Sequence, residues 1–126
     1  MKIHKSAEDY LETILVLRER QGQVRSIDIV NELSFSKPSV SVAMKRLREN
    51  NYIEMNKDGY ITLLPDGERV AQSIYGRHRL LKSFLISLGV SEEIAAADAC
   101  KIEHDISQET FEKMRAHAEK YADSKA

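Results

Sequence analysis

The sequence has no tryptophan, two prolines and a single cysteine, Cys100. A lone cysteine cannot form an intramolecular disulfide, so Cys100 is either a small buried hydrophobe or a reactive or metal-ligating thiol. No apolar run approaches the roughly 18 residues that cross a membrane, and residues 1–5 lack the apolar segment of a signal peptide. We therefore expect a cytoplasmic protein without a membrane partner.

The chain has 126 residues and a net charge of −1, but its charges are unevenly placed. Residues 36–50 carry four basic side chains and one acidic one, whereas residues 91–112 carry seven acidic side chains and one basic one. Because the basic surface is local, the near-neutral total does not argue against nucleic-acid binding. The acidic segment would repel DNA unless it held cations.

The segment from Ser36 to Asn50 is predicted to be a helix that contacts nucleic acid. Ser36 can cap the helix, and Pro38 falls in its first turn, where the missing N–H costs nothing. Apolar residues recur with helical spacing and would fasten one face to a core: Val40, Ala43, Met44 and Leu47. The other face is either an ordinary solvated basic surface or a DNA-contacting surface. With Lys57 from the following segment, the candidate DNA contacts are Lys37, Pro38, Ser39, Ser41, Val42, Lys45, Arg46, Arg48 and Lys57.

The neighbouring segments favour DNA binding. Ser26 can cap a short helix that ends near Leu33, and only three residues separate it from the next helix, which is helix-turn-helix spacing. Residues 52–55 and 60–63 are short alternating runs joined by a turn with an Asp-Gly signal, and they predict a β-hairpin. A helix-turn-helix followed by a hairpin is a winged helix, a fold that binds double-stranded DNA.

A further helix is predicted from Ser6 to about Arg20, and it contains two acids, Asp9 and Glu12. Asp9 would fall at the third helical position, where the helix dipole favours a carboxylate, and Glu12 would be a solvated surface acid. The spacing of three residues could instead present both carboxylates on one face. Taken alone, this segment favours the capping interpretation.

The C-terminal half is predicted to be helical, over 68–87, from Ser91 to Ile102, and after Ser107. The first of these helices has more apolar positions than one small domain can bury, which indicates a dimer surface. His78 lies in its middle and would be a metal ligand only as part of a cluster.

Cys100, Glu103 and His104 are spaced so that one helical turn would offer a thiolate, a carboxylate and an imidazole to a single ion. A buried thiol, a surface acid and a capping histidine are the competing interpretation. This triplet alone leaves the choice open.

Four segments resemble the metal-dependent repressors of the diphtheria-toxin-repressor and manganese-transport-regulator family: residues 6–14 (SAEDYLETI), 36–47, 75–81 (YGRHRLL) and 98–104 (DACKIEH). They occur in the family's order and span essentially the whole chain. The resemblance implies a dimeric winged-helix repressor, in the short form that ends where longer members add an SH3-like domain. It also implies a metal site built by three helices, at Asp9, Glu12, His78, Cys100, Glu103 and His104. The implied ion is Fe²⁺ or Mn²⁺, and Zn²⁺ or Co²⁺ could bind in vitro.

Several positions depart from the family pattern. Cys100 matches the iron-sensing branch, whereas Asp9 and Glu12 match the manganese-sensing branch, so the resemblance does not assign the metal. Lys82 and Ala96 occupy positions of a second metal site in the iron branch. Ser26 and Val42 likewise replace residues that contact DNA there, so the operator preference is not transferred.

We therefore expect a mainly α fold: a winged helix-turn-helix with a small β-hairpin wing over residues 1–64, and an α-helical metal-binding and dimerisation domain over residues 65–126. The expected protein is a metal-activated repressor of metal-uptake genes and not an enzyme. Its partners would be a near-palindromic double-stranded DNA operator and a second copy of the chain, with no small organic substrate. The alternatives are a small metallohydrolase that uses the same cluster, and a metal-independent winged-helix transcription factor.

Overall fold

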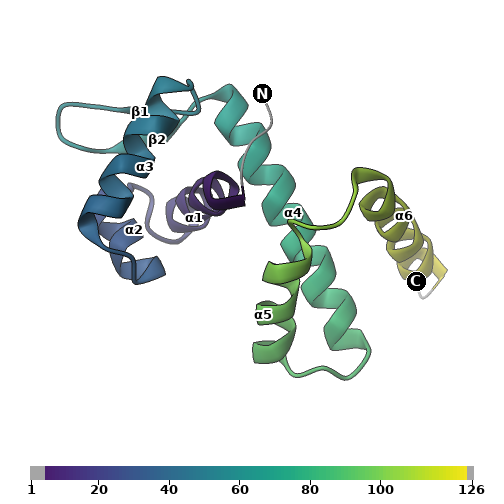
Figure 1. Ribbon diagram of the computed structural model, residues 1–126. Helices are drawn as coiled ribbons and strands as arrows, with labels where there is room; N and C mark the ends of the chain where they lie inside the picture. Colours follow the sequence, from purple (N-terminus) through teal and green to yellow (C-terminus); the bar gives the residue numbers. More distant parts are fainter. Residues whose placement is uncertain (1–4, 125–126) are drawn as a thin grey trace. The chain divides into compact units, whose positions relative to one another are not determined.

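The computed structural model describes residues 5–124, which form six helices and one two-stranded hairpin (Figure 1). The chain divides into two compact units, Met1–Ser73 and Ile74–Ala126. The N-terminal residues that underlie the signal-peptide expectation lie mostly outside the described part. Among the described residues, no helix combines the length and the apolar character that crossing a membrane requires.

The first unit contains three helices, α1 (Lys5–Gln21), α2 (Ser26–Leu33) and α3 (Lys37–Glu49). They enclose a core of fully buried side chains: Leu11, Ile14, Leu15, Val24, Ile29, Val40 and Met44. Because α1 already includes Lys5, Ser6 is not its cap and Asp9 lies beyond the first turn. The cap of α2 is Arg25, not Ser26, and the Arg25 backbone N–H donates to Asp28 Oδ2 at 2.8 Å.

The start of α3 has the predicted cap. The Ser39 backbone N–H donates to Ser36 Oγ at 3.2 Å, and Pro38 lies in the first turn. Val40, Met44 and Leu47 are buried, as the helical spacing requires. Ser34, in the turn between α2 and α3, has a left-handed backbone with φ of 57°. The helix-turn-helix geometry is thus set by local sequence signals.

The wing is a short antiparallel hairpin of β1 (Ile53–Met55) and β2 (Ile61–Leu63). Its turn is held by Asn56 Oδ1, which accepts the backbone N–H groups of Asp58 and Tyr60, each at 3.0 Å. The Ile61 N–H donates to the carbonyl of Val24 at 2.8 Å. This bond ties the wing to the segment just before α2.

The long helix α4 (Pro65–Ser87) begins three residues earlier than the predicted start at Glu68. Proline suits the first helical position because its missing N–H has no partner there in any case. Gly67 packs against Tyr52, such that a Cβ at this position would lie 2.0 Å from the Tyr52 carbonyl oxygen. Arg18 of α1 donates to both carboxylate oxygens of Glu68, at 3.0 and 2.8 Å. The start of α4 is therefore fixed within the first unit.

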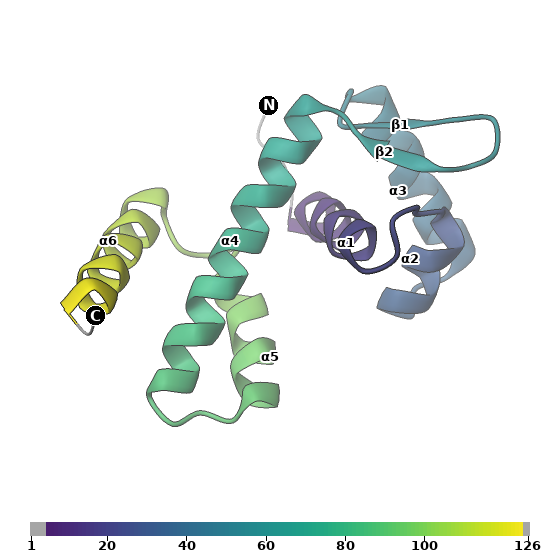
Figure 2. The same ribbon diagram turned by 180° about the vertical axis from the view of Figure 1, so that it is seen from behind.

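The second unit contains the remainder of α4, α5 (Glu92–Ile102) and α6 (Gln108–Ser124). Gly89, with φ of +102°, follows the end of α4, and α5 then runs beside α4 (Figures 1 and 2). Ala95 and Ala99 of α5 are fully buried. Among residues 74–120, four large apolar side chains are exposed: Phe84, Ile86, Leu88 and Ile94.

Candidate metal centre and nucleic-acid interface

The outer face of α3 carries the predicted DNA contacts. All eight of the predicted α3 residues are exposed, and Lys57 is exposed in the wing turn. Within residues 5–124, the basic side chains of Lys37, Lys45, Arg46 and Arg48 make no ion pair or side-chain hydrogen bond. Unpaired cations on one face are well suited to phosphate oxygens. The positive charges of this face can therefore pair with DNA phosphates without first breaking an ion pair within the protein.

The first turn of α3 allows close approach because its side chains are short. Ser36 Oγ accepts the Ser39 backbone N–H, and its hydroxyl donates to Ser39 Oγ at 2.8 Å. Val42 is 53% exposed, one turn further along the helix. An exposed valine on a recognition helix can contact a thymine methyl group.

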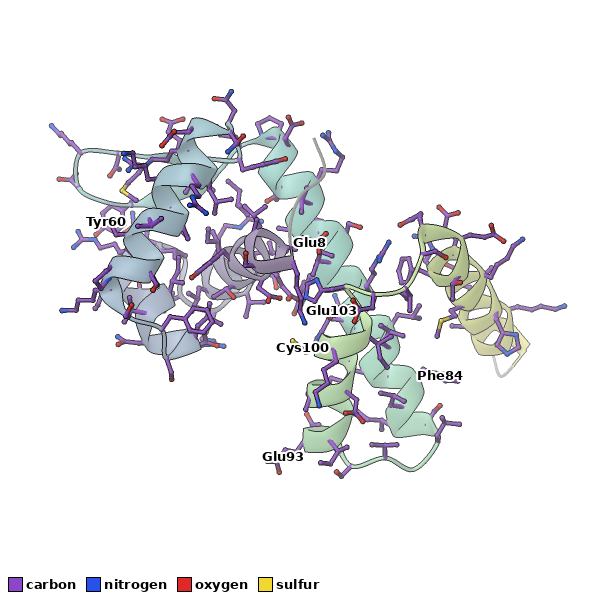
Figure 3. The ribbon with its side chains drawn as sticks, in the orientation of Figure 1. Glu8, Tyr60, Phe84, Glu93, Cys100 and Glu103 are labelled. Carbon is purple, nitrogen blue, oxygen red and sulfur yellow. The ribbon has the colours of Figure 1, made fainter. Side chains whose placement is uncertain are left out.

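Glu103, labelled in Figure 3, follows the last residue of α5, and its carboxylate is fully buried. One oxygen, Oε2, lies 2.9 Å from His78 Nδ1 of α4, and the other, Oε1, lies 3.4 Å from His104 Nε2. Among the described residues, Oε1 accepts no hydrogen bond. A buried carboxylate oxygen without a donor is costly unless a cation offsets its charge. The residues present therefore fit a metal ion.

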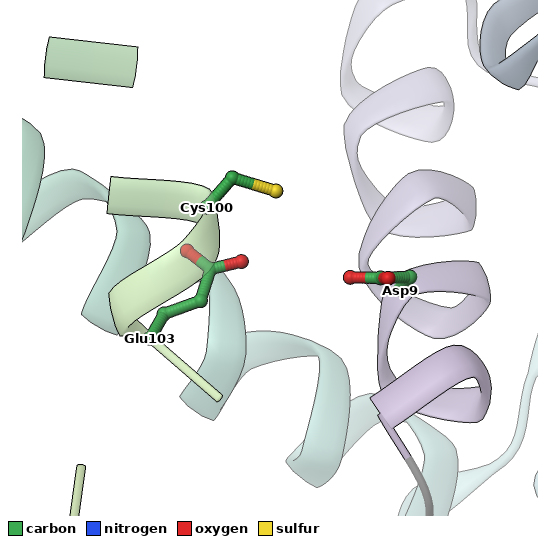
Figure 4. Close-up of side chains that lie close together, drawn as sticks. All are labelled: Asp9, Cys100 and Glu103. Carbon is green, nitrogen blue, oxygen red and sulfur yellow. The ribbon is translucent and has the colours of Figure 1, made fainter. Parts of the chain in front are cut away.

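Cys100 adds a sulfur donor to this group. Its Sγ lies within 4.8 Å of a carboxylate oxygen of Glu103, and both side chains project toward the same side of the end of α5 (Figure 4). The prediction of a single helical face for the triplet is wrong in one respect, because α5 ends at Ile102. Glu103 is the C-cap residue, and His104 lies in the turn that follows. Imidazole, carboxylate and thiolate are together a donor set for a divalent transition metal.

The two remaining predicted ligands, Asp9 and Glu12, lie on α1 of the first unit, where both are half-buried. The capping interpretation of Asp9 is wrong, because Asp9 lies beyond the first turn of α1. The Asp9 backbone carbonyl accepts the hydroxyl of Thr13 at 2.8 Å. The structure thus brings four of the six predicted ligands together in the second unit and places the other two on α1.

Sequence reasoning missed Arg77, which contacts the turn that holds Glu103. Its Nη1 donates to the Glu103 backbone carbonyl at 3.1 Å. Helical periodicity places Arg77 only as a neighbour of His78. The residues that it contacts are 26 or more positions away in the sequence, so no local pattern could have indicated the contact.

Two family models together match nearly the whole chain. The iron dependent repressor, N-terminal DNA binding domain, matches residues 2–61. The iron dependent repressor, metal binding and dimerisation domain, matches residues 64–124. The two matches and the winged helix define a transcriptional regulator with a DNA-binding part and a metal-binding, dimerising part.

Individual relatives agree with this class. The transcriptional regulator MntR of Salmonella typhimurium is 38% identical over 117 residues, which cover 93% of this chain and 74% of that protein. A manganese-dependent transcriptional repressor solved in complex with manganese is 28% identical, with a TM-score of 0.80, over 88% of this chain and 51% of that one. The structure of ScaR with bound Zn²⁺ is also 28% identical, with a TM-score of 0.72, over 90% and 53%.

This chain spans about half the length of those two solved structures. It belongs to the iron-dependent repressor family, and the resemblance found in the sequence is confirmed.

Proposed function

We propose that this protein is a metal-activated transcriptional repressor that controls metal-ion uptake genes, with Fe²⁺ or Mn²⁺ as the activating ion. The observation that carries the proposal is the fully buried Glu103 carboxylate between His78 and His104, in a chain whose other unit is a winged helix. A cation would offset the charge of the carboxylate, and the winged helix supplies the surface for DNA.

Six residues would hold the ion: Asp9, Glu12, His78, Cys100, Glu103 and His104. A bound divalent ion would supply the positive charge that allows these carboxylates and the thiolate to converge. The opposite face of α1 is part of the winged-helix core, where Leu11, Ile14 and Leu15 are buried. Engagement of Asp9 and Glu12 would therefore fix the DNA-binding unit for operator binding, which is a population shift between conformations.

The donor set supports Fe²⁺ and Mn²⁺ as activators. Carboxylates favour a hard ion such as Mn²⁺, whereas the Cys100 thiolate favours Fe²⁺ and, more strongly, Zn²⁺. Four ligands suffice for Zn²⁺, so the second unit alone could bind it and leave α1 disengaged. We therefore expect Zn²⁺ to bind tightly and to activate poorly, with Fe²⁺ slightly favoured over Mn²⁺.

The proposed partners are a near-palindromic double-stranded operator and a second copy of the chain. One recognition helix reads too few base pairs for useful specificity, so two copies would place their α3 helices in successive turns of the major groove. The dimer interface would be built from exposed apolar residues: Phe84, Ile86, Leu88 and Ile94.

We propose that residues 1–64 form the winged helix and residues 65–126 the metal-binding and dimerisation domain. The proposed site of action is the cytoplasm.

Within the DNA interface, we propose that Lys45, Arg46 and Arg48 contact phosphates. Pro38, Ser39 and Val42 would face the base edges. Lys37, Ser41 and the wing residue Lys57 complete the proposed contact set. Catalysis forms no part of this proposal, and the relatives are transcriptional regulators.

The test is fluorescence anisotropy of DNA from the protein's own promoter, measured anaerobically with Fe²⁺, Mn²⁺, Zn²⁺ or a chelator. We expect Fe²⁺ and Mn²⁺ to raise DNA affinity by roughly 5- to 150-fold, the usual range of allosteric coupling. Glu103→Gln keeps the size of the side chain but removes its charge, so this variant should lose the metal response. Glu93→Gln, a matched change at an exposed position on α5, should keep it.

Two results would favour a function other than metal-activated repression. DNA affinity that does not respond to any metal would favour a metal-independent winged-helix factor. Metal-dependent hydrolysis of generic phosphate or carboxylate esters, abolished by Glu103→Gln, would favour a metallohydrolase. Asp9→Ala distinguishes the role of α1, because it should abolish activation while it spares much of the Zn²⁺ binding.

A further inference from the structure

Arg77 of α4 contacts two other parts of the second unit, the turn after α5 and the start of α6. Its Nη1 donates to the backbone carbonyls of Glu103 and Ile106, at 3.1 and 3.2 Å. Its Nη2 donates to Gln108 Oε1 at 2.5 Å, in the first turn of α6. The guanidinium carbon also lies 5.2 Å from the ring centroid of Phe111. One side chain therefore joins α4, the turn after α5 and the start of α6.

The contact with the Glu103 carbonyl adds to the backbone cap of α5, in which the Glu103 N–H donates to the carbonyl of Ala99. The last carbonyls of a helix have no donor within the helix, and the C-terminus carries partial negative charge. Glycine, the usual residue for this position, is absent from residues 103–107. The Arg77 guanidinium supplies both a fixed fork of N–H donors and a positive charge. It thus stabilises the turn in which Glu103 and His104 are found.

Glu103 is consequently held at both ends by consecutive residues of α4. His78 lies 2.9 Å from its carboxylate, and Arg77 donates to its backbone carbonyl at 3.1 Å. A side chain held only by its carboxylate could still shift with its backbone. The contact from Arg77 removes that freedom.

We propose that Arg77 is a positioning residue for the metal centre. It holds Glu103 and His104 in register with His78, and through Gln108 and Phe111 it couples cation binding at Glu103 to the stability of α6. The inference rests on the proposed function in so far as that function places a cation at Glu103. Residues that orient metal ligands typically change metal affinity by 10- to 100-fold when they are replaced.

The test compares Arg77→Lys with Arg79→Lys. Lysine keeps the positive charge and the helix propensity but cannot reproduce the fork of donors. Arg79 is exposed two residues further along α4, with its guanidinium 5.6 Å from the Tyr75 ring. Within residues 5–124, Arg79 makes no hydrogen bond or ion pair with a predicted ligand. The probes are Mn²⁺ and Co²⁺ alone, added anaerobically to the full chain.

We expect Arg77→Lys to weaken Mn²⁺ binding by about 10- to 100-fold. The visible absorption of the Co²⁺-saturated variant should also change, because the bands report the arrangement of the ligands. In the wild type, Mn²⁺ should slow hydrogen exchange of the α6 amides from Phe111 onward, and Arg77→Lys should lose this effect. Arg79→Lys should match the wild type in all three measurements.

Three outcomes decide the matter. If Arg77→Lys lowers only the melting temperature of the metal-free protein and leaves Mn²⁺ affinity and the Co²⁺ spectrum unchanged, Arg77 is merely structural and the proposal is overturned. If the wild type binds neither ion, the proposed function itself fails, and this proposal fails with it. If Arg77→Lys does not fold, Gln108→Ala at an exposed position replaces it, and an unchanged Mn²⁺ effect on α6 exchange in that variant refutes the coupling.

Discussion

The contact between Gly67 and Tyr52 predicts that the same substitution will have opposite effects at two positions of α4. A Cβ on Gly67 would lie 2.0 Å from the Tyr52 carbonyl oxygen and 2.9 Å from the carbonyl carbon. A Cβ on Gly76 would meet nothing within 4 Å. Gly67→Ala should therefore destabilise the protein, whereas Gly76→Ala should stabilise it.

The magnitude follows from three contributions. Alanine in place of glycine favours a helix by about 0.5–1 kcal/mol, and this is the whole expected effect of Gly76→Ala. At Gly67 the overlap is with backbone and cannot be relieved by a rotamer change, so a cost of about 1–3 kcal/mol is expected from overpacking. The Leu64 N–H donates to the same Tyr52 oxygen at 2.9 Å, and weakening that bond would cost about 0.5–1.5 kcal/mol. The net loss for Gly67→Ala is about 0.5–4 kcal/mol.

The assay is urea unfolding of the metal-free protein, followed by circular dichroism at one fixed protein concentration, because dimerisation makes stability concentration-dependent. Gly76→Ala is the matched control, since it makes the same chemical change in the same helix. A Gly67→Ala variant as stable as Gly76→Ala would refute the reasoning. It would show that the start of α4 can move away from the wing at no cost.

Three further predictions concern single side chains. The hydrogen bond from Arg18 lowers the pKa of Glu68, so this half-exposed pair stabilises the fold above the ordinary glutamate pKa and loses that effect as pH falls through the lowered value. Glu68→Gln should therefore cost less than about 1 kcal/mol in urea unfolding at pH 7, and nothing at pH ~2. Arg46→Ala should weaken binding to all DNA sequences and reduce the slope of log affinity against log salt concentration by about 1. Val42→Ala should instead change base preference in a binding-site selection. An equal loss of affinity for specific and non-specific DNA in Val42→Ala would contradict a base contact by Val42. Cys100→Glu should shift activation toward Mn²⁺ in anaerobic anisotropy titrations, and an unchanged order of metals would argue against a sulfur ligand.

The winged helix could be predicted from sequence because its signals are local. Ser36 caps α3 by accepting the N–H of Ser39, three residues further on, and the buried side chains of α3 follow helical spacing. In the wing turn, Asn56 accepts backbone N–H groups and Gly59 adopts a positive φ. The fold class and the family resemblance are both confirmed. Each of these features needs only a few neighbouring residues.

The errors occur where distant residues decide the local structure. The predicted start of the long helix at Glu68 is wrong, because Pro65 starts α4 and Gly67 allows α4 to approach Tyr52. The end of α5 at Ile102 agrees with the prediction, but the contacts of Arg77 with the turn that follows were missed, because Arg77 lies on a different helix. Spacing in the sequence cannot encode such contacts. The six-residue ligand set, the DNA contacts and the domain boundary at residue 64 remain predictions.

The two faces of α1 have a consequence for how this protein can change over evolutionary time. Leu11, Ile14 and Leu15 are locked into the core of the first unit, so almost any polar replacement there would unfold it. Asp9 and Glu12 alternate with these positions but are not part of that core. Substitutions at the two acids can therefore accumulate without loss of the fold. Under the proposed ligand assignment, such substitutions would retune the ion to which the repressor responds while its DNA-reading architecture stays intact.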